Sequence, residues 1–339
     1  MSAKAGSIEA TLAAKLAEPP AQVLDDSHYQ PKAQSYWGYE GASWQEHPPT
    51  IASGSAKASS ICLITWNIDI LTGGAEARMA AALEHLESLV SSVPASHPIV
   101  IFLQEMGQSD MAQIRASSWI QKRFFLTDID ERSWNGPMYG TTTFVDRKLR
   151  VSRLFRVPWV TKFERDGLFV DISLHDESSG DARVLRLCNT HLESLVAEPP
   201  VRPLQLASAA RYLHEPHVHA ALLAGDLNAI QPFDRTLHSE NELKDAYLEL
   251  GGVEDSEEGY TWGQQVPQWM KDKFGCSRMD KVLYCGLVKV TALHRIGVGI
   301  KVADDKRQDM RDMGCEEWVT DHYGLLATAE LDVPFYARI

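Results

Sequence analysis

Five apolar runs of strand length each end in polar side chains that could bind a metal ion or a phosphate. The runs are ICLITWNI, IVIFLQE, RLCNTHLES, ALLAGDLN and VTDHYGLL. The polar residues that they deliver are carboxylates, amides and imidazoles, namely Asn67, Glu105, His191, Asp226, Asn228, Asp321 and His322. Because strand ends can converge at one edge of a sheet sandwich, we expect these side chains to form one site.

Groups of this kind suit the hydrolysis of a phosphoester. A hard divalent cation such as Mg²⁺ prefers oxygen ligands and keeps positions open for water and a phosphate oxygen. We therefore assign Glu105 to the metal, with Asn67 or Asp321 orienting it or adding a ligand. Asp226 is our candidate for the base that activates water, with Asn228 holding it or a phosphate oxygen. A protonated histidine would stabilise the charge that develops on the phosphoryl oxygens.

Each of these residues, taken singly, also has a structural explanation. An Asp-x-Asn such as GDLN is commonly a turn, and Asn67 could cap a turn. His191 and His322 could each be structural histidines. Their joint occurrence at successive strand ends favours the catalytic interpretation. Since Asp321 and His322 are adjacent, they point to opposite faces of an extended chain, so one can reach the phosphate while the other supports the site.

The segments that must position these residues begin at Ser60. Short apolar runs rich in β-branched and aromatic residues predict strands. The apolar spacing between some of them predicts helices at residues 76–90, 108–122, 204–214 and 241–250. Many strands with interspersed helices predict an α/β protein with layered sheets and outer helices.

Residues 1–58 differ from the rest of the chain. A short helix from Ile8 to Leu16 would be stopped by Pro19 and Pro20, and a polar stretch and a Ser/Ala/Gly-rich link follow. We expect residues 1–58 to be a tail that is partly disordered or draped on the domain, with a partner-binding arm as the alternative. Residues 59–339 are expected to form the catalytic domain.

Composition limits the classes of partner. The 339 residues include 46 acidic and 33 basic side chains, a formal charge of −13, so bulk charge does not bind nucleic acid. A DNA or RNA substrate requires local cations or a metal. The five cysteines form no CxxC pair, which argues against a zinc ribbon or a disulfide framework. Without a membrane-length apolar run or a signal peptide, we expect an intracellular protein that makes no membrane contact.

The polar strand ends lie in motifs that resemble the endonuclease/exonuclease/phosphatase superfamily. The motifs are TWN (65–67), LQE (103–105), HLES (191–194), GDLN (225–228), RMDKVLY (278–284) and TDH (320–322), in that superfamily's order and approximate spacing. The resemblance covers residues 60–333. It implies a four-layered α/β sandwich of two mixed sheets flanked by helices, of the deoxyribonuclease I type, with the active site at the strand ends.

Within the superfamily the chain looks most like the type 2 tyrosyl-DNA phosphodiesterases, which hydrolyse the bond between a topoisomerase tyrosine and a DNA 5′-phosphate in DNA repair. The supporting segments are TWNID (65–69), VTKFERDGLFVDIS (160–173), HLES with the RxxQ residues that follow it, and GYTWG (259–263). The resemblance implies a Mg²⁺ enzyme, with Mn²⁺ as an alternative, that acts on single-stranded DNA 5′ ends carrying a tyrosyl adduct. We expect a monomer, in the nucleus rather than the cytoplasm.

The same resemblance implies individual roles. Glu105 and Asn67 would hold the metal. The catalytic residues would be Asn67, Asp226, Asn228, His191 and His322. The substrate would be contacted by Tyr139, Arg165, Ser194, Arg202, Gln205 and Trp262, with the indole of Trp262 stacking on a base. Asp321 would support His322, and Asp280 would lie behind the residues that touch the phosphate. From the residues alone, Trp262 could equally anchor a loop, Arg165 could form a surface ion pair and Tyr139 could end a strand.

Three positions depart from the family pattern. Thr320 replaces a serine and keeps the hydroxyl, Ile70 replaces a glycine, and Ile230 replaces an arginine whose place Arg235 could take. Ile230 leaves a second interpretation open, in which the chain is another phosphoesterase of the superfamily: a nuclease, or a phosphatase acting on a lipid or a nucleotide. A third interpretation, an inactive scaffold that binds nucleic acid or protein, predicts a lost acidic or histidine residue, and none is lost.

Overall fold

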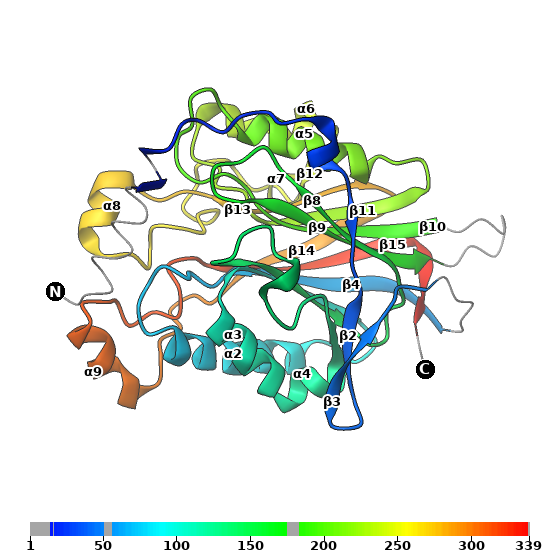
Figure 1. Cartoon of the computed structure of the whole chain (residues 1–339), viewed down its shortest axis with the longest axis horizontal. Helices are drawn as coiled ribbons and strands as arrows, with labels where there is room; N and C mark the ends of the chain where they lie inside the picture. The colour runs from blue at the N-terminus through cyan, green and yellow to red at the C-terminus, as the bar shows by residue number, and fades with distance from the viewer. Residues whose placement is uncertain (1–13, 16, 51–55, 175–182, 338–339) are drawn as a thin grey trace.

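The computed structural model describes residues 14–15, 17–50, 56–174 and 183–337. The chain folds into two mixed β-sheets that pack face to face, with helices on the outer face of each sheet (Figure 1). This four-layered α/β sandwich confirms the predicted fold class. In the described part of the chain, no helix is both long enough and apolar enough to cross a membrane.

The first sheet carries the strands that lead to the TWN, LQE and TDH motifs. Its strands are, in order across the sheet, β14 (Val288–Ile296), β15 (Gly324–Ala337), β4 (Ala56–Asn67), β5 (Ile99–Met106), β7 (Gly140–Asp146), β6 (Phe124–Leu126), β2 (Tyr36–Glu40) and β3 (Ser43–His47). Strands β4 and β5 are parallel, so both bring their carboxyl ends to the same edge.

The second sheet carries the strands that lead to the HLES and GDLN motifs. Its strands are, in order, β12 (Lys244–Asp245), β13 (Asp280–Gly286), β11 (Val218–Asp226), β10 (Arg183–His191), β9 (Asp166–Leu174), β8 (Val151–Pro158) and β1 (Lys32–Ala33). Strands β10 and β11 are parallel, and one residue pair, Phe335 opposite Leu174, links β15 to β9.

Helices on the two outer faces complete the layers (Figure 1). One group is α2 (Ala75–Ser92), α3 (Gln108–Ala116) and α4 (Ser118–Arg123), and the other is α5 (Arg202–Leu213) and α6 (Leu237–Glu240). The short α7 (Ala246–Glu249) lies beside β13 and β14, with Ala246 in the core between the sheets. Two further helices, α8 (Gln268–Phe274) and α9 (Asp304–Asp312), and three 3-10 turns, at Asp26–Tyr29, Glu131–Ser133 and Pro232–Arg235, lie in connections.

Two of the predicted helices differ from the structure. The helix expected at 108–122 is divided at Ser117, whose backbone is extended at φ −72° and ψ 117°, into α3 and α4. The helix expected at 241–250 is replaced by β12 and the short α7, because Lys244 and Asp245 pair with β13. Tertiary strand pairing overrides local helix preference here. The helix expected from Ile8 to Leu16 lies largely outside the described residues.

Alternation along the strands decides which side chains face the other sheet. In β4, Ile61 and Leu63 pack in the core between the sheets, whereas Ile64 and Trp66 pack under α2. Because successive side chains point to opposite faces, Asn67 falls on the inner face. The same period in β11 places Asp226 on the inner face after Leu222 and Ala224. The apolar core therefore ends where the site begins.

A buried polar layer joins the sheets directly below the site. The Gln104 side-chain amide donates to Thr65 Oγ1 at 3.0 Å and, across the interface, to Asn189 Oδ1 at 2.8 Å. The Asn189 amide donates in turn to the Thr142 carbonyl oxygen at 2.9 Å. All four residues are fully buried. Since an unmade hydrogen bond here would be costly, this layer fixes how the two sheets face each other.

Part of the segment expected to be a tail forms strands. β2 joins the first sheet where Trp37 pairs with Leu126, and β1 joins the second sheet beside β8. The Trp44 indole donates to the Arg115 carbonyl oxygen at 3.2 Å. These contacts dock residues 32–47 on the sandwich. The domain division at residue 58 stays a prediction.

Gly225, which immediately precedes Asp226, supplies a stability prediction. Its φ is +148°, and a Cβ built there would lie 1.8 Å from the Thr190 carbonyl oxygen on the neighbouring strand. Gly225→Ala is expected to lower the free energy of unfolding by about 3 kcal/mol or more, because strain and overpacking add.

The matched control is Gly251→Ala. Gly251 has φ +90°, and nothing lies within 4 Å of a Cβ built there. The free energy of unfolding of this variant should fall only by the cost of a positive φ at alanine, about 1 kcal/mol. Urea unfolding of both variants measures the difference, and equal losses would contradict the steric explanation.

Candidate active site

The predicted site residues converge between the two sheets. Asn67 ends β4 and Glu105 lies near the end of β5 in the first sheet, while His191 and Asp226 end β10 and β11 in the second. The remaining predicted members of the central group are Asn228, Asp280, Asp321 and His322, which lie in the segments that follow β11, start β13 and precede β15. The convergence that the strand-end pattern predicts is therefore present.

The Asp226 carboxylate is the centre of this group. Its Oδ2 accepts a hydrogen bond from the Asn67 side-chain amide at 3.0 Å, and its Oδ1 accepts one from the Asn228 backbone N–H at 2.8 Å. The same Oδ2 lies 3.3 Å from His191 Nε2 and 3.6 Å from His322 Nε2. Asp226 is only 2% exposed. Two amides and two imidazoles, rather than lysine or arginine, therefore surround this buried carboxylate.

These contacts determine the charge of Asp226 and its neighbours. Burial by itself raises the pKa of Asp226, but His322, His191 and the hydrogen bonds outweigh burial and hold that pKa well below its usual value. Burial lowers the pKa of His191 to about 4, and the Arg165 guanidinium adds to this shift. Asp226 is thus ionised and His191 neutral near pH 7.

His322 is held as a cation by carboxylates. Its Nδ1 lies 2.8 Å from Asp280 Oδ2 and its Nε2 lies 3.9 Å from Asp321 Oδ1. Although burial opposes protonation, Asp280, Asp226 and Asp321 raise the pKa of His322 well above its usual value. The Trp66 indole donates to the His322 carbonyl oxygen at 3.1 Å and fixes the backbone. Asp280, which was expected to lie behind the residues that touch the phosphate, thus contacts His322 directly.

Glu105 reaches the site through a strained backbone. Alternation after Leu103 would point its side chain toward the outer helices, but its φ is +56° and the β5–β7 register shifts between Leu103 and Met106. Its Oε2 accepts from the Ile70 backbone N–H at 3.1 Å, and its Oε1 lies 3.8 Å from His191 Nε2. A left-handed residue other than glycine costs about 1–2 kcal/mol, which is typical of a functional position.

The charges around Glu105 suit a hard cation. Burial and the carboxylate of Asp69 raise its pKa to about 7, Arg165 opposes this shift and Asp321 adds to it. In the part of the chain that the structure describes, no lysine or arginine forms an ion pair with Glu105. A cluster of buried carboxylates without enough cations, offering oxygen ligands, fits Mg²⁺ or Mn²⁺.

Among the described residues, the group whose potential ligand atoms all lie within 4.8 Å of one another is Asp226 with Asp280 and His322, and Glu105 is not part of it. In this group, however, Nδ1 of His322 faces Asp280 and Nε2 faces Asp226. Because these carboxylates raise the pKa of His322, the ring is protonated at both nitrogens and has no lone pair for a metal ion. We therefore interpret this group as a hydrogen-bonded triad and keep Glu105 as the expected centre of metal binding.

Arg165 lies beside His191. Its Nη1 donates to His191 Nδ1 at 2.6 Å and its Nη2 to Ser194 Oγ at 2.6 Å, while its guanidinium stacks 5.1 Å from the Tyr139 ring centroid. The Tyr139 hydroxyl donates to the Phe163 carbonyl oxygen at 2.9 Å. Arg165 and Tyr139 also line a small pocket that reaches His191. The structure therefore groups Arg165, Ser194 and Tyr139 with the central residues.

Arg202 and Gln205 do not reach the same space. Arg202 is 2% exposed, and its donors bind Asp234 at 2.9 and 2.7 Å and the carbonyl oxygens of Glu193 and Leu195 at 3.1 and 2.7 Å. Gln205 is fully buried and accepts from the Glu193 N–H at 2.8 Å. Their polar groups hold the loop that follows His191, and a direct contact of either residue with the substrate stays a prediction.

Trp262 is also buried, with 8% of its surface exposed. Its indole donates to Asp321 Oδ2 at 2.7 Å, and its ring packs with Val266, Met279 and Ile230. This arrangement favours the loop-anchoring interpretation of Trp262 over base stacking. It also explains Ile230, which contributes to this apolar cluster. Arg235, which could replace the family arginine, instead pairs with Asp255 at 2.6 Å on the surface.

Sequence reasoning missed two residues that shape the site. Asp69 belongs to TWNID, two residues after Asn67, and its backbone N–H donates to Asn67 Oδ1 at 2.9 Å. The Thr320 hydroxyl donates to the Asn67 carbonyl oxygen at 2.8 Å and accepts from the His322 N–H at 3.2 Å. The threonine hydroxyl therefore connects two site segments. Their place inside recognised motifs was the only sequence signal for either residue.

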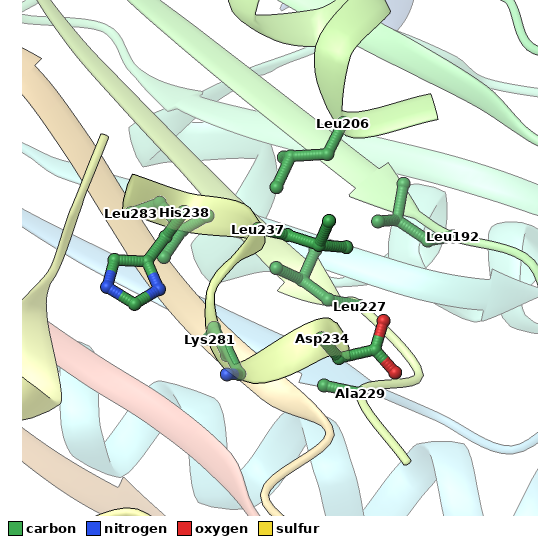
Figure 2. Close-up of a pocket in the computed structure, with 9 residues that line it drawn as sticks. All are labelled: Leu192, Leu206, Leu227, Ala229, Asp234, Leu237, His238, Lys281 and Leu283. Carbon is green, nitrogen blue, oxygen red and sulfur yellow. The ribbon is translucent and has the colours of Figure 1, made fainter. Parts of the chain in front are cut away.

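A separate pocket lies behind this site (Figure 2). Five leucines line it, together with Ala229, Asp234, His238 and Lys281. None of the predicted site residues contributes to it. Its lining groups belong to the core under α5 and α6, so this pocket is a packing feature and not a competitor for the catalytic site.

The model of the Endonuclease/Exonuclease/phosphatase family matches residues 64–322. No curated protein matches the chain. Among solved structures, truncated TDP2 from Caenorhabditis elegans is similar with a TM-score of 0.58 and 21% identity, over 80% of this chain and 97% of that one.

Two further structures share the fold. TDP2 from D. rerio, complexed with single strand DNA product, has a TM-score of 0.58 and 18% identity over 80% of this chain and 99% of that one. The human Nocturnin catalytic domain with bound sulfate anion has a TM-score of 0.54 and 16% identity over 81% and 95%. Because the family model spans most of the chain and supports a hydrolase acting on phosphoester bonds, the protein belongs to the endonuclease/exonuclease/phosphatase family.

Proposed function

We propose that the protein is a Mg²⁺-dependent phosphodiesterase that hydrolyses 5′-phosphotyrosyl bonds between DNA ends and a trapped topoisomerase. The observation that carries the phosphodiesterase part is an ionised Asp226 held between the protonated His322 and the Asn67 amide, beside Glu105. The tyrosyl-DNA part rests on the motifs resembling type 2 tyrosyl-DNA phosphodiesterases. It is supported by the likeness to TDP2 structures, one of them with a single strand DNA product.

Each site residue has a separate role in the proposed reaction. Asp226 stays ionised, so it orients the attacking water and accepts its proton as the water oxygen bonds to phosphorus. The bond between phosphorus and the tyrosine oxygen breaks, and tyrosine leaves as a phenolate that takes a proton from solvent. His322 donates from Nε2 to a phosphoryl oxygen, and Arg165 supplies a second positive charge, so both stabilise the transition state. Glu105, oriented by the Ile70 N–H, would hold the metal with Asn67. When bound, the metal supplies Lewis-acid stabilisation of the phosphate.

The surface next to Trp262 offers contacts for a DNA strand. On α8, Trp269 is 62% exposed and Phe274 is 52% exposed, and Phe274 packs edge-on against Trp262 at 6.4 Å. Lys271 and Lys273 lie on the same helix. Exposed aromatic rings and cations together bind single-stranded nucleic acid through stacking and phosphate pairing. Trp269 therefore takes the stacking role that the sequence suggested for Trp262.

One observation favours a second candidate within the same family. The structure uses three positions that bear on DNA binding for internal contacts. Arg202 and Gln205, expected to contact the substrate, are buried, and Ile230, which replaces a family arginine, packs in an apolar cluster. The site therefore offers fewer DNA contacts than the sequence motifs predict. The second candidate is therefore a phosphoesterase acting on another substrate, such as a nuclease or a nucleotide phosphatase.

The deciding assay compares substrates directly. A 5′-phosphotyrosyl oligonucleotide should release tyrosine in the presence of Mg²⁺, and EDTA should abolish this release because Glu105 and its neighbours then lack their cation. A 3′-phosphotyrosyl oligonucleotide and an abasic duplex should remain uncut. Cleavage confined to either of these two substrates would refute the tyrosyl-DNA assignment and favour the second candidate.

Asp226→Asn should lower kcat by about 10²- to 10⁴-fold, because an amide cannot accept the proton from water. The variant keeps the shape of the side chain, so circular dichroism should show a folded protein. Asp305→Asn on α9, an exposed carboxylate, is the control and should keep full activity. Near-full turnover by Asp226→Asn would contradict the assigned role.

Thr320 offers a paired test of site geometry. Thr320→Ser keeps the hydroxyl that binds the Asn67 carbonyl oxygen, so its kcat should stay within about threefold. Thr320→Val removes the donor and leaves a buried carbonyl unpaired, so kcat should fall by about 10-fold or more, as is typical when a supporting hydrogen bond is lost. Equal activity of the two variants would show that the hydroxyl does not position the site.

A further inference from the structure

Arg78, a buried residue on the first turns of α2, uses every donor it has on backbone carbonyl oxygens. It is 1% exposed. Its guanidinium carries five N–H groups in a rigid plane. These groups donate, over 2.5–3.1 Å, to the carbonyl oxygens of Ile68, Asp69, Thr72, Gly73 and Val319. No role was predicted for Arg78 from the sequence.

The five carbonyl oxygens come from two segments that carry site residues. Four belong to residues 68–73, directly after Asn67. In this loop the Ile70 N–H orients Glu105, and the Asp69 N–H orients Asn67. The fifth belongs to Val319, whose own N–H donates to the Ile300 carbonyl oxygen at 3.1 Å, and which immediately precedes Thr320–His322. One guanidinium therefore contacts both sides of the site.

Backbone oxygens, more than a carboxylate, compensate the Arg78 charge. The nearest carboxylate oxygen in an ion pair with it is Asp69 Oδ2, 3.9 Å from Nη1. Because Ile68 and Val319 are buried, their carbonyl oxygens need a donor within the protein. Lysine offers three donors on one nitrogen and cannot reach five oxygens spread over a plane. The arrangement thus requires arginine specifically.

We propose that Arg78 is a positioning residue that sets the separation between the 68–73 loop and the 319–322 segment, so that Glu105 and His322 can act on one phosphate. This role rests on the proposed site, but it also predicts a property of the protein without substrate or metal. Replacing Arg78 should make both segments more mobile at the same time, although they are about 240 residues apart in sequence.

A general stabilising role is the competing explanation, and Arg186 provides the matched control. Arg186 is also buried and multiply bonded, to Asp171 at 2.6 and 2.7 Å and to the Tyr212 carbonyl oxygen at 2.7 Å. It lies in β10 five residues before His191, and in the described part of the chain its hydrogen-bond partners are Asp171, Tyr212, Glu215 and His217, none of them in a site segment. Arg186→Lys therefore reports the cost of disturbing a buried arginine elsewhere.

The first measurement is amide hydrogen exchange of the metal-free full chain. Arg78→Lys should raise exchange at least tenfold in both 68–73 and 319–322, while β10 and β11 stay protected. Arg186→Lys should leave both site segments unchanged. Faster exchange in only one of the two segments, or a uniform rise across the chain, would overturn the proposal.

The second measurement separates positioning from substrate choice. Arg78→Lys should weaken Mn²⁺ binding, followed by electron paramagnetic resonance, and lower kcat by about 10- to 100-fold while KM changes less than threefold. If the exchange result holds but no tyrosyl-DNA cleavage is seen even in the wild type, the proposed function fails and the positioning role stands. Unchanged Mn²⁺ affinity would contradict the proposal.

A second variant covers the case in which lysine does not fit. Arg78→Ala should regain protection of both segments when guanidinium chloride is added at a few tens of millimolar, because the free ion can donate to the same oxygens. Urea at the same concentration should not restore it. Failure of both variants to fold would assign Arg78 to global stability and overturn the positioning role.

Discussion

The constraint on which the rest of the structure depends is one ionised carboxylate, Asp226, which is buried between two sheets and, among the described residues, forms no ion pair with a lysine or an arginine. A buried charge is tolerated only when hydrogen bonds and opposite charges replace water. Here those groups come from both sheets: the Asn67 amide from the first, His191 and the Asn228 N–H from the second, and His322 from the segment before β15. The stability of the charge therefore requires the sandwich to close correctly.

The packing below and behind the site serves this requirement. The Gln104 and Asn189 amides bridge the sheets in the last buried layer before Asp226. Arg202 with its Asp234 partner holds the loop after His191, and Arg78 holds the loop after Asn67. Buried arginines are costly unless every donor is used, and here their donors bind backbone carbonyl oxygens or paired carboxylates. The buried polar groups thus fix the positions of these loops. Apolar packing alone would not give the loops a defined geometry.

The sequence predicted the site where strand period and strand ends decide it. Asn67 and Asp226 follow from alternation, and the motif resemblance placed Asp280 behind the residues that touch the phosphate. The sequence did not show side-chain direction where it depends on distant partners. Arg202 and Gln205 sit on a helix whose polar groups face a loop, and Trp262 is covered by residues from three segments. The helix expected at 241–250 gave way to strand pairing with β13, a contact that local propensity does not contain.

The sequence by itself determined the layered α/β class, the set of polar residues at strand ends and the chemistry that they suit, because periodicity and residue type are local properties. Only the tertiary structure decided which charges exist. The protonated His322, the neutral His191 and the raised pKa of Glu105 arise from burial and from carboxylates that lie far away in the chain. Tertiary contacts also turned Glu105 inward through a left-handed backbone and brought Arg78 to two loops at once, since both depend on neighbours supplied by the closed sandwich.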